Sequence, residues 1–357
     1  MLNSIVDSFG HQRLFFSRFI PCSVRSVAIF ALLLALTVSI TNGNLANAHT
    51  LTGDLARVYA LTGDRHMADP SVIRVGTCYY GFSTGFQGGP GHGSPTIRKT
   101  CDTTLRTGWT YIGTVFTNTP AWITAALGSQ PPNLWAPDIN YWNGKYHLYY
   151  AGSLWGTAFA VMGLATATHI EGPWTDAGEV TRVNYPIDPN VAWGPGGVAY
   201  ITWGSWTGNY GISMHVLDQT TGKLSTSNKT LWHIANGIEA TTMSFNGGYY
   251  YLWGSKGTCC QGVNSTYYTV VGRSTSITGP FLDKNGTNMN NGGGTTVLTG
   301  SWPKVAAGGA DEFDDPTYNV AQRLAYHYYD ANNNGQETLD IRTITYSNGW
   351  PVLSAPL

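Results

Sequence analysis

The stretch Glu239-Ala-Thr-Thr-Met-Ser-Phe-Asn-Gly-Gly-Tyr-Tyr-Tyr-Leu-Trp-Gly-Ser255 decides the fold. An acidic residue heads a strand-like segment, a tight Gly-Gly turn and an aromatic strand that ends in serine, which is the pattern of a β-hairpin. Three further units span 14 to 17 residues from acid to serine: Asp69 to Ser83, Asp138 to Ser153 and Asp188 to Ser205. A looser fifth copy runs from Asp315 to Asp330. A repeated hairpin of this length is typical of a propeller.

The spacing of the units predicts how many blades there are. Successive heads lie 50 to 76 residues apart, and a four-stranded blade takes about 40–50 residues. We therefore predict an all-β, five-bladed β-propeller that forms one catalytic domain over residues 49–357. Insertions at 85–136 and 285–309 are expected to be loops, the first of them a wall of the binding cleft. Acids at equivalent points of radial blades would meet near the axis, where glycosidic bond cleavage needs paired carboxylates.

Composition narrows the class of partner. Charged residues make up 11% of the chain, aromatic residues 13%, and the formal net charge is −1. So few charged residues and so small a net charge exclude nucleic acid as a partner, because proteins bind nucleic acid through clustered Lys and Arg. Many Tyr and Trp with few charges favour a β-rich protein and a carbohydrate ligand, although strand packing explains most individual aromatic residues.

The first residues have the pattern of a signal peptide. Arg13, Arg18 and Arg25 precede an apolar run over 27–40, and Ala46-Asn-Ala48 offers a small-residue cleavage site. We predict that residues 1–48 are removed and that the mature protein is secreted, monomeric and free of the membrane. The apolar run is shorter than the roughly 20 residues of a membrane span, so an uncleaved anchor is the weaker alternative.

The mature chain would contain four cysteines: Cys78, Cys101, Cys259 and Cys260. An oxidising compartment permits disulfides, and four cysteines allow three connectivities. A bond between Cys78 and Cys101 would tie the first hairpin to the following segment. The adjacent Cys259 and Cys260 form either a vicinal disulfide beside a pocket or two free thiols, and the sequence leaves both open. The chain has no CxxC spacing that would favour zinc.

Six strings in fixed order give a family resemblance: Ala-Asp69-Pro-Ser-Val, Leu-Trp-Ala-Pro-Asp138-Ile, Ile-Asp188-Pro-Asn, Gly-Ile-Glu239-Ala, Cys259-Cys260-Gln-Gly with Ser-Thr-Tyr and Val-Gly-Arg273-Ser, and His327-Tyr-Tyr-Asp330. Over about residues 60–350 the chain resembles glycoside hydrolase family 43, and within it the endo-1,5-α-L-arabinanases. The resemblance implies a five-bladed propeller that hydrolyses internal α-1,5-L-arabinofuranosyl bonds of plant cell-wall arabinan with inversion.

The resemblance also assigns roles to three carboxylates. An inverting glycosidase needs one carboxylate to deprotonate water and one protonated carboxyl to protonate the leaving oxygen, about 6.5–9.5 Å apart. Carboxyls that share a partly desolvated pocket raise the pKa of one of them, which keeps the acid protonated. By resemblance Asp69 is the general base, Glu239 the general acid and Asp188 the group that tunes the pKa of the acid. The alternative is that each acid bonds turn amides, which explains one acid better than three.

Further candidates surround these three. Asp138 also heads a unit, but its role is ambiguous. We count it among the substrate-binding candidates while expecting a structural role. The other substrate-binding candidates are Trp122, Trp135, Ser153, Ser205, Trp206 and Arg273, the last of which could instead bond Glu239. By resemblance His327 lies at a central cation, generally calcium, that is held largely through water. Calcium usually has many oxygen ligands, so one His would make an unusual site, and a core His is the alternative.

Two rival functions remain open. An exo-acting arabinofuranosidase or β-xylosidase would use the same scaffold with a closed pocket in place of an open groove. A lectin-like propeller would bind sugar without cutting it, but the presence of all three acids argues against that function. Because propellers have many activities, the functional prediction depends on the acids and not on the fold.

Overall fold

The computed structural model describes residues 61–315 and 321–357 of the 357-residue chain. The predicted signal peptide over 1–48 lies outside the described residues. Within the described ranges, no helix has the length and apolar character that a membrane span requires. Nearly all regular structure is β-strand, so the prediction of an all-β protein is confirmed.

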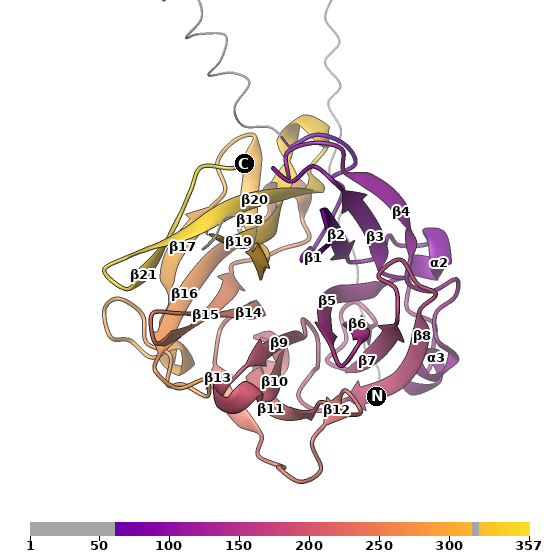
Figure 1. The fold of residues 1–357 in the computed structure, drawn as a ribbon, viewed down its shortest axis with the longest axis horizontal. Helices are drawn as coiled ribbons and strands as arrows, with labels where there is room; N and C mark the ends of the chain where they lie inside the picture. The colour runs from indigo at the N-terminus through magenta and orange to yellow at the C-terminus, as the bar shows by residue number, and fades with distance from the viewer. Residues whose placement is uncertain (1–60, 316–320) are drawn as a thin grey trace, which may run out of the picture. The chain divides into compact units, whose positions relative to one another are not determined.

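The first two sheets are four-stranded antiparallel meanders in chain order (Figure 1). Sheet one contains β1 (Ser71–Val75), β2 (Cys78–Ser83), β3 (Thr96–Thr100) and β4 (Thr110–Thr114), with the short helix α2 (Pro90–Gly93) between β2 and β3. Sheet two contains β5 (Leu134–Trp142), β6 (Lys145–Ser153), β7 (Ala160–Ala167) and β8 (Thr175–Thr181), and helix α3 (Ala121–Leu127) precedes it.

The third sheet has five strands and the fourth has eight. Sheet three contains β9 (Asn190–Trp193), β10 (Ala199–Ser205), β11 (Gly211–Asp218), β12 (Lys223–Leu224) and β13 (Trp232–Ala235), with η1 (Pro195–Gly197) and η2 (Thr207–Asn209). Sheet four begins with β14 (Glu239–Asn246), β15 (Tyr249–Lys256), η3 (Gly262–Asn264), β16 (Tyr268–Ser274), η4 (Met289–Asn291) and β17 (Thr295–Thr299). It continues with β18 (Lys304–Asp315), β19 (Ala321–Asp330), η6 (Ala331–Asn333), β20 (Gln336–Ser347) and β21 (Trp350–Leu353). A single parallel residue pair, Tyr268 with Ala307, joins these two antiparallel halves.

The hairpins follow from their turn residues. Asn143 and Gly144 both have positive φ between β5 and β6, as do Gly247 and Gly248 between β14 and β15. Two left-handed residues in succession give a turn whose twist matches that of the strands, and Asn and Gly adopt this conformation at low cost. In four of the five predicted units the structure has the antiparallel strand pair that the sequence indicated.

The fifth unit was placed wrongly. Asp315 was expected to head its first strand, but that strand, β18, begins at Lys304 and reaches Asp315 at its end. Its beginning, Lys-Val-Ala-Ala-Gly-Gly-Ala, lacks the aromatic pattern of the other units, which explains the error. The two predicted loops were also wrong in part. Residues 85–136 contain β3, β4 and the buried Trp109, while 285–309 contain β17 and the beginning of β18.

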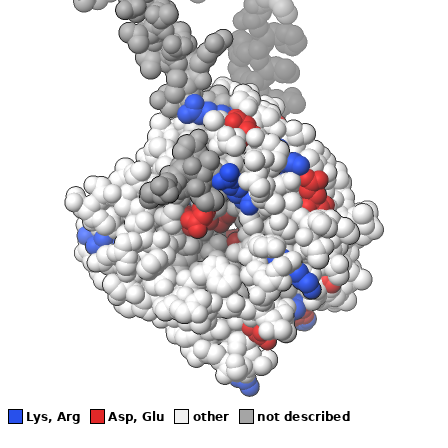
Figure 2. All heavy atoms as spheres, viewed as in Figure 1, with Lys and Arg blue, Asp and Glu red and all other residues white. Residues whose placement is uncertain are grey.

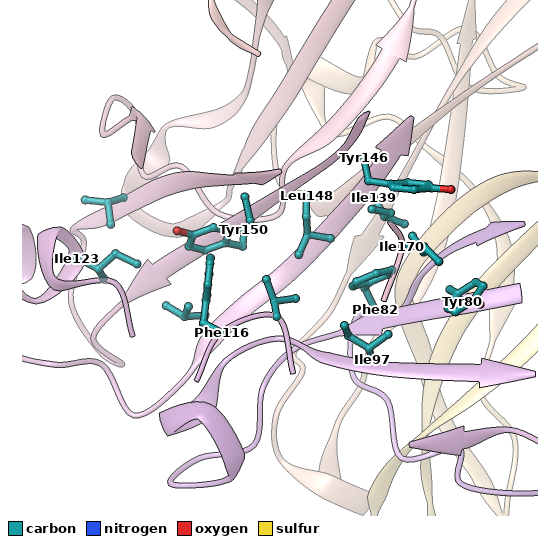
Figure 3. Packing of buried hydrophobic residues seen from close by; sticks show 14 residues of the cluster. Tyr80, Phe82, Ile97, Phe116, Ile123, Ile139, Tyr146, Leu148, Tyr150 and Ile170 are labelled. Carbon is teal, nitrogen blue, oxygen red and sulfur yellow. The ribbon is translucent and has the colours of Figure 1, made fainter. Parts of the chain in front are cut away.

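Apolar clusters join each sheet to the next. Tyr80, Phe82 and Ile97 of sheet one pack with Leu148 and Tyr150 of sheet two (Figure 3). Similar clusters join sheet two to sheet three, sheet three to β14–β16, and β15–β16 to β19–β20. Another cluster joins β19–β20 to sheet one. The first strands of the units also meet, because β1 contacts β5 and β18, β9 contacts β5 and β14, and β14 contacts β18. This arrangement brings the beginnings of these strands together.

Candidate active site

The three predicted carboxylates stand at the N-terminal ends of three of these strands. Asp69 lies two residues before β1, Asp188 lies two residues before β9, and Glu239 is the first residue of β14. Asp69 and Asp188 have φ of 49° and 53°, and Ala240 beside Glu239 has 48°. Non-glycine residues seldom adopt this left-handed conformation, and such strain concentrates at functional sites.

Glu239 has the environment of a carboxyl that holds its proton. The residue is only 9% exposed. Ser205 Oγ donates to Oε2 at 2.8 Å, and Tyr267 OH donates to Oε1 at 3.1 Å. Burial raises the pKa of Glu239, the two hydrogen bonds oppose that rise, and the charge of Asp69 adds to it. A raised pKa is what a general acid needs near neutral pH.

Asp188 links the other two acids electrostatically. Its Oδ2 accepts the backbone N–H of Ala240 at 3.0 Å, which fixes it beside Glu239. Burial raises the pKa of Asp188 well above its usual value, and the charges of Glu239 and Asp69 raise it further. The charge of Asp69 therefore disfavours ionisation of both Glu239 and Asp188.

Asp69 is the more accessible group. Its side chain is 28% exposed, and Thr84 Oγ1 donates to Oδ2 at 2.7 Å. The Asp69 backbone N–H donates to His327 Nδ1 at 3.1 Å, and Oδ1 lies 3.6 Å from the same nitrogen. An exposed carboxylate with oriented oxygens can accept a proton from water. A cavity of about 30 Å³, lined in part by Asp69, Asp188 and Gly309, has room for one water molecule.

Comparison with known proteins agrees with this geometry. The model of "Glycosyl hydrolases family 43" matches residues 62–351. The chain belongs to glycosyl hydrolase family 43. It is 39% identical over 298 residues to the extracellular endo-α-(1→5)-L-arabinanase 1 of Bacillus subtilis, which covers 80% of this chain and 87% of that protein.

Two further relatives show the breadth of the group. A GH43 endo-arabinanase from Bacillus licheniformis superposes with a TM-score of 0.74 at 34% identity, covering 82% of this chain and 99% of that one. An extracellular exo-α-(1→5)-L-arabinofuranosidase of Cellvibrio japonicus is 32% identical over 314 residues, covering 79% of this chain and 85% of that protein. The family membership makes this chain a glycoside hydrolase.

Asp138 of this family 43 hydrolase lies behind the three acids. It is 5% exposed and accepts hydrogen bonds from the side chains of Asn140 and Asn190 and from the Val191 backbone N–H. Burial, and then the charge of Asp311, raises its pKa well above the usual value. These contacts hold β5 and β9 together, and a direct contact with sugar stays a prediction.

The serine candidates are buried at strand ends. Ser205 contacts Glu239 as described above, whereas Ser153 Oγ donates to the carbonyl of Phe159 at 2.8 Å. Trp206, directly after Ser205, is 48% exposed. Trp135 donates through its indole N–H to Asn133 and faces Trp155 edge-on at 6.1 Å between ring centroids.

Two candidates of this hydrolase lie elsewhere. Trp122 donates to Asp176 at 3.3 Å on β8, the fourth strand of its sheet. Arg273 does not bond Glu239, so that expectation was wrong. Its guanidinium bonds the Gly349 carbonyl and lies over the rings of Tyr249 and Trp350 at 4.3 and 4.5 Å. The strand register explains this position. On β15, Glu239 pairs with Ser255, whereas Arg273 pairs with Tyr251, four residues away.

Sequence reasoning missed several contacts of the site. Tyr267, which donates to Glu239, was not named as a candidate. It is the tyrosine of the Ser-Thr-Tyr string that carried the resemblance, so that string was the available signal. Gly309, with φ of 58°, approaches so closely that a Cβ there would lie 2.6 Å from Asp69 Oδ1. Trp155, Phe159 and Tyr210 are exposed on the segments that follow β6 and β10, at the same strand ends as the acids.

The structure has both the Cys78–Cys101 bond and, of the two alternatives left open for the adjacent cysteines, the vicinal disulfide. Cys78 on β2 joins Cys101 directly after β3, and Cys259 joins Cys260. The backbone N–H of Cys260 donates to Tyr329 OH at 2.6 Å, and Cys259 packs beside Tyr267 and Tyr329. The vicinal pair therefore lies against the tyrosines that surround Glu239 and His327.

Proposed function

We propose that this family 43 hydrolase cleaves internal α-1,5-L-arabinofuranosyl bonds of arabinan. The observation that carries the proposal is a buried, hydrogen-bonded Glu239 that interacts through charge with a more accessible Asp69, both at the N-terminal ends of their strands. The endo-arabinanases among its relatives support the choice of substrate.

We propose an inverting mechanism with three distinct roles. Asp69 takes a proton from water as that water attacks the anomeric carbon, and Glu239 protonates the departing oxygen. Asp188 is the third carboxyl, which tunes the protonation of Glu239 and accepts the Ala240 amide beside it. Ser205 and Tyr267 orient the Glu239 carboxyl so that the proton faces the scissile bond. Proton NMR of the first products tests inversion, because α-linked substrate must release β-arabinofuranose ends.

The scaffold in this proposal is a five-bladed propeller over residues 49–357. It is supported by five successive first strands that contact one another in chain order, with β18 also contacting β1. The long sheet provides two of the five blades, β14–β17 and β18–β21, which only one parallel residue pair joins. Secretion as a monomer after removal of residues 1–48 belongs to the same proposal, and relatives named extracellular support it.

A calcium ion at His327 is part of the proposal. His327 is 2% exposed, and its Nε2 is buried without a hydrogen-bond partner among the described residues. Because Nδ1 accepts the Asp69 backbone N–H at 3.1 Å, the neutral ring carries its proton on Nε2, which would donate to a water bound to the ion. No group of three or more His, Cys, Asp or Glu side chains in 61–315 and 321–357 is arranged to hold a metal. His327 would therefore contact the ion through a bound water, with further waters as ligands, and the ion would supply positive charge beside Asp69.

Exo action is the second candidate, because one relative is an exo-acting arabinofuranosidase. Debranched 1,5-arabinan digested by the secreted protein distinguishes the two, with products resolved by size over time. Early mixed oligosaccharides and a rapid fall in viscosity are expected for endo action. Arabinose alone from the first time point would establish exo action. If the wild type released no more product than Glu239→Gln, the result would favour a protein that binds sugar without cleaving it.

A further inference from the structure

A second cavity lies at the opposite ends of the strands that carry the acids. It has a volume of about 960 Å³, and its lining includes Arg74, Tyr141, Trp193 and Phe245 from the far ends of β1, β5, β9 and β14. Glu239 and Phe245 stand at opposite ends of β14, six residues apart, which corresponds to about 20 Å of strand. The mouth of the cavity is therefore far from the acids, while Asp138, Asn190 and Asp311 line both this cavity and the small one beside Asp69. Its volume is in the range of ligand pockets.

Exposed aromatic rings surround the mouth of this cavity. Tyr141, Trp193 and Phe245 are 54%, 42% and 52% exposed, and each comes from a different sheet. Neighbouring rings hold them in place, with centroid distances of 4.7 Å to Tyr146, 5.8 Å to Trp142 and 4.6 Å to Tyr250, respectively. Rings fixed in this way present flat apolar faces to a ligand at little cost in side-chain entropy.

The floor of the cavity is polar. Asp138, Asn140, Asn190, Asp311 and Glu312 line it. Figure 2 shows acidic residues within a hollow that is bordered by Lys or Arg on one side and by uncharged surface on another. Glu312 Oε1 is buried and has no hydrogen-bond partner among the described residues. An unpaired buried carboxyl oxygen is costly unless a ligand or water bonds it. Hydroxyl groups of a ligand would supply such bonds.

The chemistry favours a neutral polyhydroxyl ligand. In the part of the chain that the structure describes, no three or more of the acidic, His or Cys side chains form a metal-binding group. A purely apolar ligand would leave the buried Glu312 Oε1 without a partner. A sugar satisfies both surfaces, because its C–H faces stack on the rings while its hydroxyls donate to the carboxyl and amide oxygens.

We propose that this cavity is a second carbohydrate-binding site, which holds another segment of the same neutral pentose polysaccharide. This inference rests on the proposed function for its choice of sugar. A polymer offers many equivalent segments, so a chain held at the second site raises the local concentration of bonds near the acids. The site acts on polymer and leaves cleavage of short oligosaccharides unchanged.

Binding is measured by electrophoresis through gels that contain debranched 1,5-arabinan. The full chain carries Glu239→Gln to prevent cleavage, with and without Trp193→Ala and Phe245→Ala, singly and together. We expect the double variant to bind arabinan about tenfold more weakly. Val352→Ala, which alters a 48% exposed residue on β21 outside the cavity, is the matched control and keeps full affinity. With Glu239 intact, all variants should hydrolyse arabinohexaose at the wild-type rate.

The outcomes separate this inference from the proposed function. If arabinan retards the folded double variant as strongly as the parent, the second site is overturned while arabinan cleavage stands. The same follows if Val352→Ala loses as much affinity for arabinan as the double variant. Cleavage of arabinohexaose that falls together with binding also overturns it, since the aromatic residues would then act on the catalytic end. If the wild type cleaves no arabinan but its retardation still depends on Trp193, the second site is supported and the proposed function is overturned. Thermal melting of each variant confirms that it is folded.

Discussion

The protonation of Glu239 is set by contacts that single substitutions can remove. Tyr267 OH stabilises the ionised carboxylate by donating to Oε1, which lowers the pKa of Glu239 against the effect of burial. In Tyr267→Phe that bond is lost, so the pKa rises and the acid stays protonated to higher pH. We expect the alkaline limb of the kcat/KM profile on arabinan to move to higher pH.

The control for this substitution is Tyr251→Phe. Tyr251 on β15 is also buried but donates to the Gly349 carbonyl, away from the acids. Its pH profile should match the wild type, whereas Ser205→Ala should shift the limb in the same direction as Tyr267→Phe. An alkaline limb that stays in place in both Tyr267→Phe and Ser205→Ala would remove Glu239 from the role of acid.

Gly309 permits the close approach of Asp69 and His327. A Cβ at this position would lie 2.6 Å from Asp69 Oδ1 and 2.7 Å from the His327 ring. Gly309→Ala must displace one of them, and displacement of a catalytic group by 1 Å costs about 100-fold in rate. We expect kcat to fall by about that factor while the protein remains folded.

Gly247→Ala separates this effect from backbone strain. Gly247 has φ of 56°, close to the 58° of Gly309, but a Cβ there has no atom within 4 Å. Both variants lose stability because alanine is strained at positive φ, by about 1 kcal/mol. Equal kcat values for the two variants, measured beside their melting temperatures, would show that the contact with Asp69 has no catalytic importance.

At the scale of elements, buried acids join the strands behind the site. Asp311 on β18 accepts the Val72 backbone N–H of β1, and burial raises its pKa to about 6. A carboxyl whose pKa is higher in the folded state stabilises the protein fully below its unfolded pKa, about 3.8, and this contribution is lost as the pH rises through 6. Above pH 6 the loss amounts to at most about 3 kcal/mol.

Asp311→Asn should therefore raise the melting temperature at pH 7.5. The amide cannot ionise, and its oxygen can still accept the Val72 N–H. We expect the free energy of unfolding of the variant to change less than that of the wild type between pH 4 and 7, as measured by urea titration at each pH. A variant that is less stable at pH 7.5 would show that the ionised form holds β1 to β18.

The elements were predictable where local chemistry specifies them. Gly turns between aromatic strands placed four hairpins, because turn type and strand pattern are properties of adjacent residues. The third and fourth strands of sheet one were missed, and residues 85–136 were taken for a loop. Their pairing depends on β2, so the information lies in contacts between strands. Asp315 was misplaced because the Ala and Gly residues of β18 conceal its pattern.

At the scale of the molecule, the positions of the acids were predictable because they repeat along the chain. The residues that contact them were missed because they belong to no repeat. Asp69, Asp188 and Glu239 occupy equivalent positions in three units, so a comparison of the units reveals them. Tyr267 reaches Glu239 from 28 residues away, and Gly309 reaches Asp69 from the other end of the chain. Only the assembled sheets bring such residues together, and no local pattern encodes those distances.

The low charge of the whole molecule predicts how its rate responds to salt. The chain has a formal net charge of −1, and only 11% of its residues are charged. Electrostatic steering requires charge on both partners, and arabinan carries none. The kcat/KM on arabinan should therefore change by less than about twofold between 0.05 and 0.5 M NaCl, although screening shortens the Debye length several-fold over that range. The measurement compares initial rates at fixed pH, with the melting temperature recorded at each salt concentration. A steep fall in rate with salt, without loss of stability, would indicate a charged substrate and would contradict the assignment of a neutral polysaccharide.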